Sequence, residues 1–169
     1  MNNCLDAFLT QLLNGRADLS TEFPIFDGKV IMLYDEYTIV KNPQEIVVSP
    51  PVKKKPVTKI KGKNIVVTFQ DSLMPGRTYT IDFGASLVDN NEGNIAPRMV
   101  YTFSTGTTVD SMYICGNIID CKTLAPVKGA LVTLYSDLSD SACFLTLPDA
   151  AAKTDDWGFF SIRNIKDTT

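Results

Sequence analysis

The sequence predicts an all-β protein built from β-sandwiches. Three observations predict this class: apolar and polar residues alternate with a period of two from Gly28 onward, turn-forming residues separate the alternating runs, and no helical pattern intervenes between the runs. Sandwiches need many short strands joined by turns, whereas a parallel sheet needs helices between its strands. The pattern therefore favours sandwiches.

The first residues of the chain show a helical period instead. Apolar residues at positions 5, 8, 9, 12 and 13 form one stripe, and Asn14-Gly15 supplies a stop signal, so we predict a short N-terminal helix over residues 3–14. Such a helix packs against a sandwich edge or lies upstream of the true domain. A membrane-surface helix would need a polar face rich in Lys and Arg, which this segment lacks.

Nine strands are predicted after this segment. In RTYTIDF, Tyr79, Ile81 and Phe83 share one face and the polar residues between them share the other, which is typical of a half-buried strand. RMVYTFS repeats the pattern with Tyr101 and Phe103. The predicted strands span residues 29–34, 45–49, 57–61, 64–69, 77–83, 98–104, 112–119, 130–135 and 159–164.

The small and polar stretch STGTTVD divides these strands into two groups, as a short interdomain connector would. We expect an N-terminal helical segment at 1–19, a complete sandwich at 20–106 with about six strands, a linker at 107–110, and a partial second sandwich at 111–169 with three or four strands. A partial sandwich leaves strand edges unpaired. It therefore invites dimerisation, aggregation or completion by another chain.

Composition argues against catalysis and against several partner classes. The chain of 169 residues is 44% hydrophobic and 21% charged, as a folded domain should be, and its net charge of −3 gives no general reason to expect nucleic acid. It has no histidine, which removes the commonest general base and metal ligand. We predict no catalytic, cofactor-binding or metal-binding residue.

The four cysteines, Cys4, Cys115, Cys121 and Cys143, form no C-x-x-C pair, which argues against a zinc site. We expect them to be buried as small apolar residues, and a disulfide between Cys115 and Cys121 is the alternative. No apolar run is long enough to span a membrane. The N-terminus is a poor secretory signal, so either the protein is cytoplasmic or its true N-terminus is missing.

The segment from Leu73 to Gly106 resembles the C-terminal half of the bacterial Ig-like domains of S-layer-type and other envelope proteins. It carries their T-Y-T strand at 78–80, a counterpart of their x-D-x-x-G-N turn from Asp89 through Gly93-Asn94, and their F-S-T strand at 103–105. Upstream, Tyr34-Asp35-Glu36 stands where the family usually has F-D-E. The resemblance implies an Ig-like β-sandwich for residues 20–106.

The remaining residues resemble the start of a carboxypeptidase-regulatory or prealbumin-like domain, which is a non-catalytic module. GNIIDCKTLAPVKGALVTLY resembles the opening of that domain, and TDDWGFFSIRNI resembles its later turn and strand. The matching positions in the first motif are Gly116, Asp120, Pro126, Val127, Gly129 and Ala130. The tandem implies a lipid-anchored or secreted envelope protein of a Bacteroides-type bacterium.

Four features invite a site, and each has a simpler structural interpretation. Six lysines between Lys53 and Lys63 could bind phosphate or an anionic glycan, but no aromatic residue interleaves them, and a solvated strand face that discourages edge pairing explains them better. The turn from Asp89 to Asn94 crowds oxygen ligands that calcium would accept, yet Asx turns use the same residues. Asp155-Asp156 and the SDLSDS run at 136–141 are interpreted as turns for the same reason.

Two further candidates concern sugars. Asp35 and Glu36 are adjacent in a strand and point to opposite faces, so they cannot act together as glycosidase carboxylates. Trp157 could stack on a sugar ring, but we expect it to pack over the turn before Phe159.

The sequence thus favours a non-catalytic structural or adhesive module of the cell envelope, with an unknown protein or glycan partner and no nucleic acid. A carbohydrate-binding or enzyme-accessory module is the alternative. A hydrolase would need a catalytic pair that the sequence does not offer.

Overall fold

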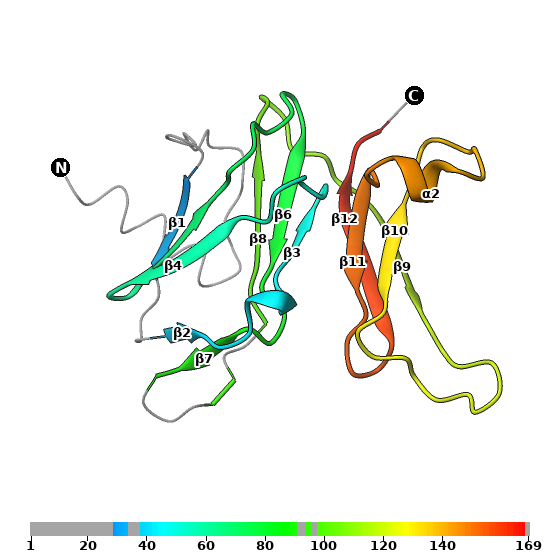
Figure 1. Cartoon of the computed structure of the whole chain (residues 1–169), viewed down its shortest axis with the longest axis horizontal. Helices are drawn as coiled ribbons and strands as arrows, with labels where there is room; N and C mark the ends of the chain where they lie inside the picture. Colours follow the sequence, from blue (N-terminus) through cyan, green and yellow to red (C-terminus); the bar gives the residue numbers. More distant parts are fainter. Residues whose placement is uncertain (1–28, 34–37, 91–93, 96–97, 168–169) are drawn as a thin grey trace.

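A computed structural model gives the fold of the chain (Figure 1), and it describes residues 29–33, 38–90, 94–95 and 98–167. Within these residues the chain forms short antiparallel strands with almost no helix, which confirms the all-β prediction. The helix expected over residues 3–14 lies outside the described residues. We use the names N-terminal unit for residues 29–105 and C-terminal unit for residues 111–167.

The N-terminal unit is a sandwich of two three-stranded antiparallel sheets and one smaller sheet. The first sheet has the order β1 (Lys29–Leu33), β5 (Asn64–Thr68) and β4 (Val57–Lys61). The second has the order β3 (Val47–Ser49), β6 (Thr78–Asp82) and β8 (Val100–Ser104). The small sheet pairs β2 (Thr38–Val40) with β7 (Leu87–Asp89), and one 3₁₀ turn spans Pro43–Glu45.

The core of this sandwich forms where the apolar faces of the two large sheets meet. Tyr79 and Phe103 are directly opposed in the β6–β8 ladder, and their rings stack at 5.6 Å between centroids. Phe69 meets the Phe103 ring edge-on at 5.8 Å. Such aromatic pairs add to the stabilisation that burial itself gives. The buried cluster contains Val30, Ile46, Val48, Ile65, Val67, Phe69, Tyr79, Ile81, Phe83, Leu87 and Phe103.

The C-terminal unit contains two separate two-stranded sheets. One pairs β9 (Met112–Asn117) with β12 (Phe159–Ile165), and the other pairs β10 (Leu131–Leu134) with β11 (Ala150–Lys153). A single helical turn, α2 (Ala142–Leu145), lies between β10 and β11. The buried cluster between the sheets is small: it consists of Ala150, Ala152 and Ile162, with Val132, Leu134, Phe160 and Ile165 packed against it.

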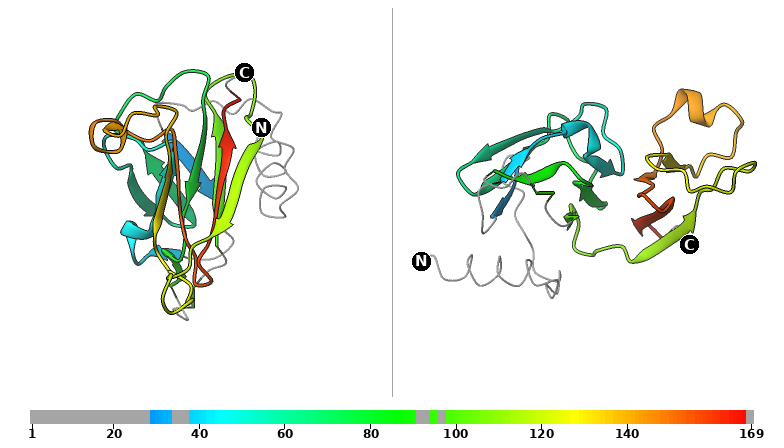
Figure 2. Two further views of the ribbon diagram at one scale, coloured as in Figure 1. Left: turned by 90° about the vertical axis from the view of Figure 1, so that its right-hand side faces the viewer. Right: turned by 90° about the horizontal axis from the view of Figure 1, so that it is seen from below.

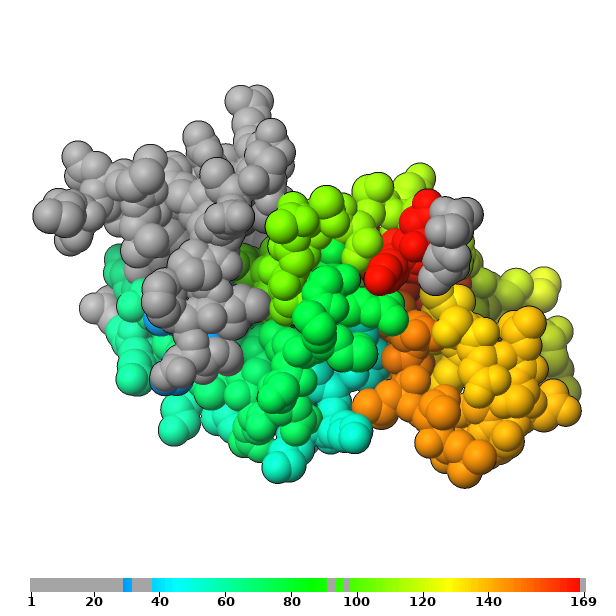
Figure 3. All heavy atoms as spheres, turned by 90° about the horizontal axis from the view of Figure 1, so that it is seen from above, coloured from blue at the N-terminus to red at the C-terminus, as the bar shows by residue number. Residues whose placement is uncertain are grey.

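The two units lie against each other along β11 and β12. In Figure 1 these two strands face the N-terminal unit, whereas β9 and β10 lie on the far side. The view from below shows the two sheets of the C-terminal unit edge-on, and the space-filling view shows the orange and red segments meeting the cyan and green ones (Figures 2 and 3). Strand β11 contacts β3, and β12 contacts β6.

The structure corrects several strand predictions. The N-terminal unit has eight strands where about six were expected, because β2 (TIV) and β7 (LVD) are too short for alternation to be detected. Strand β11 has the sequence AAAK, and alanine is a poor indicator of a strand. The strand predicted from residue 45 begins at Val47, since the preceding residues form the 3₁₀ turn.

The prediction that the strand around Tyr79 is half-buried is wrong. Residues 78–81 are buried on both faces, and only Asp82 is partly open. The apolar face packs into the sandwich core as expected, but the polar face is covered by β12 of the C-terminal unit. A polar face that is buried needs hydrogen-bond partners, and these define the junction between the units.

Candidate functional site

The junction between the two units is held by polar contacts from five strands, β3, β6 and β8 on one side and β11 and β12 on the other. The Ala151 N–H on β11 donates to Ser49 Oγ on β3 at 3.1 Å. The Lys153 Nζ donates to Glu45 Oε2 at 2.7 Å, in a pair whose side chains are about one-quarter to one-third exposed. These contacts join β11 to the edge of the second sheet.

Asn164 makes the most connections across the junction. It lies in a β-bulge of β12 with φ of 59°, a left-handed conformation that asparagine tolerates better than most residues. Its Oδ1 accepts from Thr80 Oγ1 at 3.0 Å and from Thr102 Oγ1 at 3.5 Å, and its Nδ2 donates to the Asp110 carbonyl oxygen at 2.7 Å. One side chain therefore joins β6, β8, the connector and β12.

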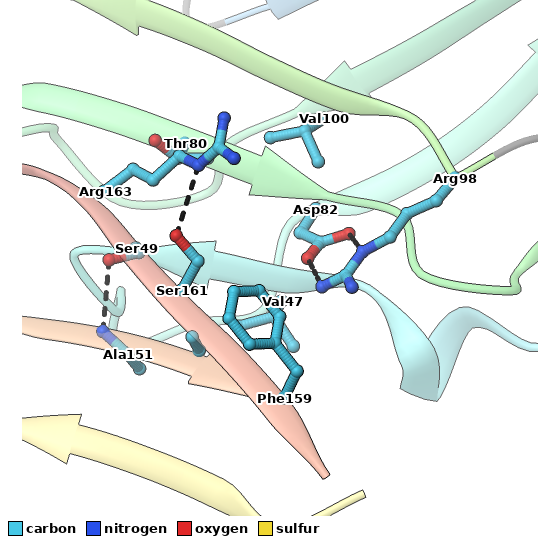
Figure 4. Close-up of a pocket in the computed structure, with 11 residues that line it drawn as sticks. Val47, Ser49, Thr80, Asp82, Arg98, Val100, Ala151, Phe159, Ser161 and Arg163 are labelled. Carbon is cyan, nitrogen blue, oxygen red and sulfur yellow. Dashed lines mark hydrogen bonds and ion pairs between the residues drawn. The ribbon is translucent and has the colours of Figure 1, made fainter. Parts of the chain in front are cut away.

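A pocket of about 170 Å³ opens beside these contacts (Figure 4). At one end, Arg98 and Asp82 form a two-pronged ion pair, with Nε to Oδ1 at 3.2 Å and Nη2 to Oδ2 at 2.5 Å. The hydrogen bond to Asp82 raises the pKa of Arg98 further above its ordinary value, so the guanidinium stays charged. The Phe159 ring and the hydroxyl of Ser161 come from β12.

Arg163 lies at the opposite end of the pocket. Its Nε donates to Ser161 Oγ at 3.2 Å, and within the described residues it has no carboxylate partner. The lining thus combines one aromatic ring, hydroxyl groups, a neutralised ion pair and one further cation. The pocket is smaller than the ~300 Å³ at which drug-sized ligand sites begin. It has room for one small group that is polar and has a flat apolar surface to lie against the Phe159 ring.

The carboxylate that lines the pocket belongs to Asp82, and both of its oxygens accept hydrogen bonds from Arg98. Among the described residues, no three side chains of Cys, Asp or Glu gather in an arrangement that could hold a metal ion.

The features that the sequence singled out lie elsewhere. Lys59 and Lys61 are exposed on either side of the half-buried Ile60, on the edge strand β4, so the predicted solvated strand face is confirmed. In the turn that was a candidate for calcium, the Asp89 N–H donates to the Asn94 backbone oxygen at 2.9 Å. Residues 91–93 of this turn lie outside the described part. Asp35 and Glu36 also lie outside it.

The acidic turns are confirmed as turns. Asp155 Oδ1 accepts from the N–H groups of Trp157 at 2.9 Å and Phe159 at 3.0 Å. Asp137 Oδ1 accepts from the Ser139 N–H at 2.9 Å. Each carboxylate serves the backbone of its own loop, as Asx-turn chemistry predicts.

Two expectations about buried side chains are wrong. Trp157 is 78% exposed and does not pack over its turn. Cys115, Cys121 and Cys143 are exposed free thiols, so the predicted burial and the alternative disulfide between Cys115 and Cys121 are both absent from the structure. Trp157 and Cys121 lie in turns and Cys143 lies in α2, so the facing sheets do not cover them, and Cys4 lies outside the described residues.

No pattern in the sequence indicates the pocket. Asp82 stands on the polar side of an alternating strand, Arg98 follows a proline, and Arg163 and Asn164 continue another strand, which are ordinary positions for exposed residues. The left-handed Asn164 could have been suspected only from its tolerance of that conformation. The residues meet because the units dock, which no local pattern reveals.

A comparison with protein-family models bears on the N-terminal unit. A model described as "Bacterial Ig-like domain" matches residues 17–105, more than half of the chain. The chain belongs to the bacterial Ig-like domain family. The matched residues include β1 to β8, and thus both sheets of the Ig-like sandwich and the Asp82–Arg98 end of the pocket. No curated protein and no solved structure matches the chain.

Proposed function

We propose that this chain is a non-catalytic structural or adhesive module of a bacterial cell-envelope or secreted protein. The observation that carries the proposal is the closed Ig-like sandwich docked against a second β unit through Asn164. Such an arrangement suits a spacer that holds loops or partner domains in a fixed orientation. Within the described residues no helix is long and apolar enough to cross a membrane.

The C-terminal unit is proposed to be part of a carboxypeptidase-regulatory or prealbumin-like domain, with the domain limits at 20–106 and 111–169. The motif residues hold structural positions that support this reading. Asp120 accepts hydrogen bonds within its turn, Pro126 bridges to Ile119, and Gly129 adopts a φ of 76°. None of these roles is chemical, which agrees with a non-catalytic module.

Small-angle X-ray scattering on the chain tests the spacer role. A spacer should show one compact scattering envelope, and the Asn164→Gly variant should broaden its distribution of interatomic distances. A wild-type profile that already requires many relative orientations of the units would contradict the proposal. A second experiment screens the chain against glycosidase, esterase and peptidase substrates. Reproducible turnover of any substrate would contradict the proposed non-catalytic role.

A carbohydrate-binding module is the second candidate, and the exposure of Trp157 favours it. An indole that is 78% exposed is available to stack on a sugar ring, and the nearby strand contributes Phe159 and Arg163 to the pocket. Affinity electrophoresis in gels that contain bacterial or host polysaccharides tests this function. Trp157→Ala or Arg163→Ala should abolish retardation, while Phe144→Ala, which removes a ring from α2 that is at least as exposed, should not.

The lysine-rich strand β4 gives no reason to expect a nucleic-acid partner. Lys59 and Lys61 lie on an edge strand without aromatic neighbours between them, and the chain is acidic overall. Partners are instead proposed to be envelope proteins or glycans, and the open strand edges of the C-terminal unit provide a route to other β-strands, including those of a second copy.

A further inference from the structure

Strand β9 has an open backbone edge. Among the described residues it pairs only with β12. The Ile118 N–H donates to the Gly158 oxygen at 2.8 Å, in register with the β9–β12 ladder, so Gly116 and Ile114 also direct their backbone groups toward β12. The alternate residues Tyr113 and Cys115 therefore direct their N–H and C=O groups away from β12, toward the open edge.

This edge lacks the features that protect other edges of the molecule. The β9 sequence MYICGN has no charged residue and no proline. By contrast, edge strand β4 carries the exposed Lys59 and Lys61, and inward or outward charges of this kind discourage strand addition. Strand β9 is instead exposed and apolar, with Met112 at 49%, Tyr113 at 68% and Ile114 at 47% exposure.

The apolar face of the sheet also continues beyond its last covered strand. Ile114 is directly opposite Ile162 in the ladder, so both side chains lie on the same face. Ile162 is buried at 3% exposure, whereas Ile114 remains about half exposed on the outer strand. A further strand beside β9 would cover Ile114 and extend the small core.

We propose that β9 pairs antiparallel with the β9 strand of a second copy of this chain, about a two-fold axis at Ile114. Residues with outward backbone groups must oppose each other, which places Tyr113 opposite Cys115 of the other copy. The same register brings the two Ile114 side chains together on the inner face. It joins the sheets into one four-stranded sheet with the order β12-β9-β9-β12.

A second copy fits this edge for two physical reasons. The edge carries no charge, so two identical edges meet without repulsion. A two-fold pairing also covers the open edge of both β9 strands. No β9 edge then remains for a third copy, so association through this strand stops at the dimer. A heterologous strand would cover one edge only and would need its own matching apolar alternation.

Sedimentation velocity of the chain over a dilution series tests the dimer. We expect a reversible monomer–dimer equilibrium. The double variant Tyr113→Lys with Cys115→Lys places two like-charge pairs across the proposed register and should weaken association about tenfold or more. Both side chains are exposed, so circular dichroism should show an unchanged fold.

A charge-reversed variant makes the test specific for the register. Tyr113→Glu with Cys115→Lys places opposite charges across the same two pairs and should restore dimerisation to near the wild-type level. The control Leu138→Lys with Phe144→Lys adds the same charge at exposed apolar sites away from β9 and should leave association unchanged. A wild-type chain that stays monomeric at all concentrations would refute the proposal, as would equal dissociation constants for the two β9 variants.

Discussion

The N-terminal and C-terminal units are both built from short antiparallel strands, yet they bury their apolar residues very differently. In the N-terminal unit, two three-stranded sheets enclose eleven buried apolar residues that include four aromatic rings. In the C-terminal unit, two two-stranded sheets enclose three, and two of these are alanines. Strand number per layer therefore decides how much of an alternating pattern becomes core.

The number of exposed apolar side chains also differs between the two units. Among the described residues, eighteen large hydrophobic side chains are exposed, and thirteen of them lie at or beyond Val109. They include Phe144 at 85% and Leu138 at 94% exposure. Because the core of the C-terminal unit is small, a larger share of the stability of this unit must come from turn hydrogen bonds and from contacts with the N-terminal unit.

The largest expected effect comes from the aromatic core. Phe103→Ala removes a ring that is 4% exposed and contacts Phe69 and Tyr79, so the free energy of unfolding of the N-terminal unit should fall by about 3–5 kcal/mol. Phe160→Ala in the C-terminal unit removes a half-buried ring and should cost less than half as much. Amide hydrogen exchange resolves the two units. Equal losses would contradict the comparison.

The second prediction concerns a turn on which the C-terminal unit depends. Gly158 has a φ of 71°, and a Cβ there would clash with the Ile118 carbonyl oxygen and crowd Val127 N. Gly158→Ala should therefore destabilise the unit by about 2–3 kcal/mol, through backbone strain and displacement of the β9–β12 ladder. Thermal unfolding measures the loss.

Gly129→Ala is the matched control for this turn. Gly129 also has a positive φ, at 76°, but the nearest atom to its Cβ position would be the flexible end of Lys153 at 3.5 Å. The substitution should cost only the conformational penalty of about 1 kcal/mol. If both alanines cost the same, the close approach at Gly158 does not contribute to stability.

A third prediction tests how far the C-terminal unit depends on its neighbour. Asn164→Gly keeps the left-handed backbone accessible but removes the hydrogen bonds to Thr80, Thr102 and Asp110, so it should destabilise the chain by about 1–2 kcal/mol. Hydrogen exchange should accelerate in β12 more than in β5. Leu124 is the other left-handed non-glycine residue among those described, and because its side chain is exposed, Leu124→Gly should not destabilise the chain. Acceleration confined to β5 would argue against the assigned role.

How much of the fold could be predicted from the sequence depends on how far apart in the chain the interacting residues are. Alternation located Tyr79, Ile81 and Phe83 in the core, since each strand's own pattern contains that information. It failed for Thr80 on the opposite face, because the hydrogen-bond partner of Thr80 is Asn164, 84 residues away. The fold class and Ig-like family followed from local pattern and motif, and the family match confirms both.

The candidate pocket was beyond such prediction for the same reason. Asp82 lies on β6, Arg98 just before β8 and Arg163 on β12 of the other unit, and their proximity follows from docking rather than from spacing. The expectation that Trp157 and the cysteines are buried failed because Trp157 and Cys121 lie in turns and Cys143 lies in α2, where the sheets do not cover them. Apolar composition indicates which residues could be buried, but the position of a residue in the fold decides which ones are.

The smallest expected effect is a response to acid that is confined to the C-terminal unit. Backbone hydrogen bonds from Thr123 and Lys122 and the Thr123 hydroxyl lower the pKa of Asp120 below its ordinary value. A carboxyl whose folded pKa is depressed stabilises the fold above its unfolded pKa, and this contribution is lost as the pH falls through the folded value. The loss should therefore occur below about pH 4.

Asp120→Asn provides the control for the acid response, because an amide oxygen can accept the same hydrogen bonds without titrating. Carboxyl NMR titration of the wild type should show a midpoint for Asp120 below that of an unstructured aspartate. The chemical shifts of residues 118–127 should follow this midpoint in the wild type and stay constant in the variant. An ordinary midpoint would mean that these turn bonds do not favour the charged carboxylate, and Asp120 would then contribute nothing to the response of the C-terminal unit to acid.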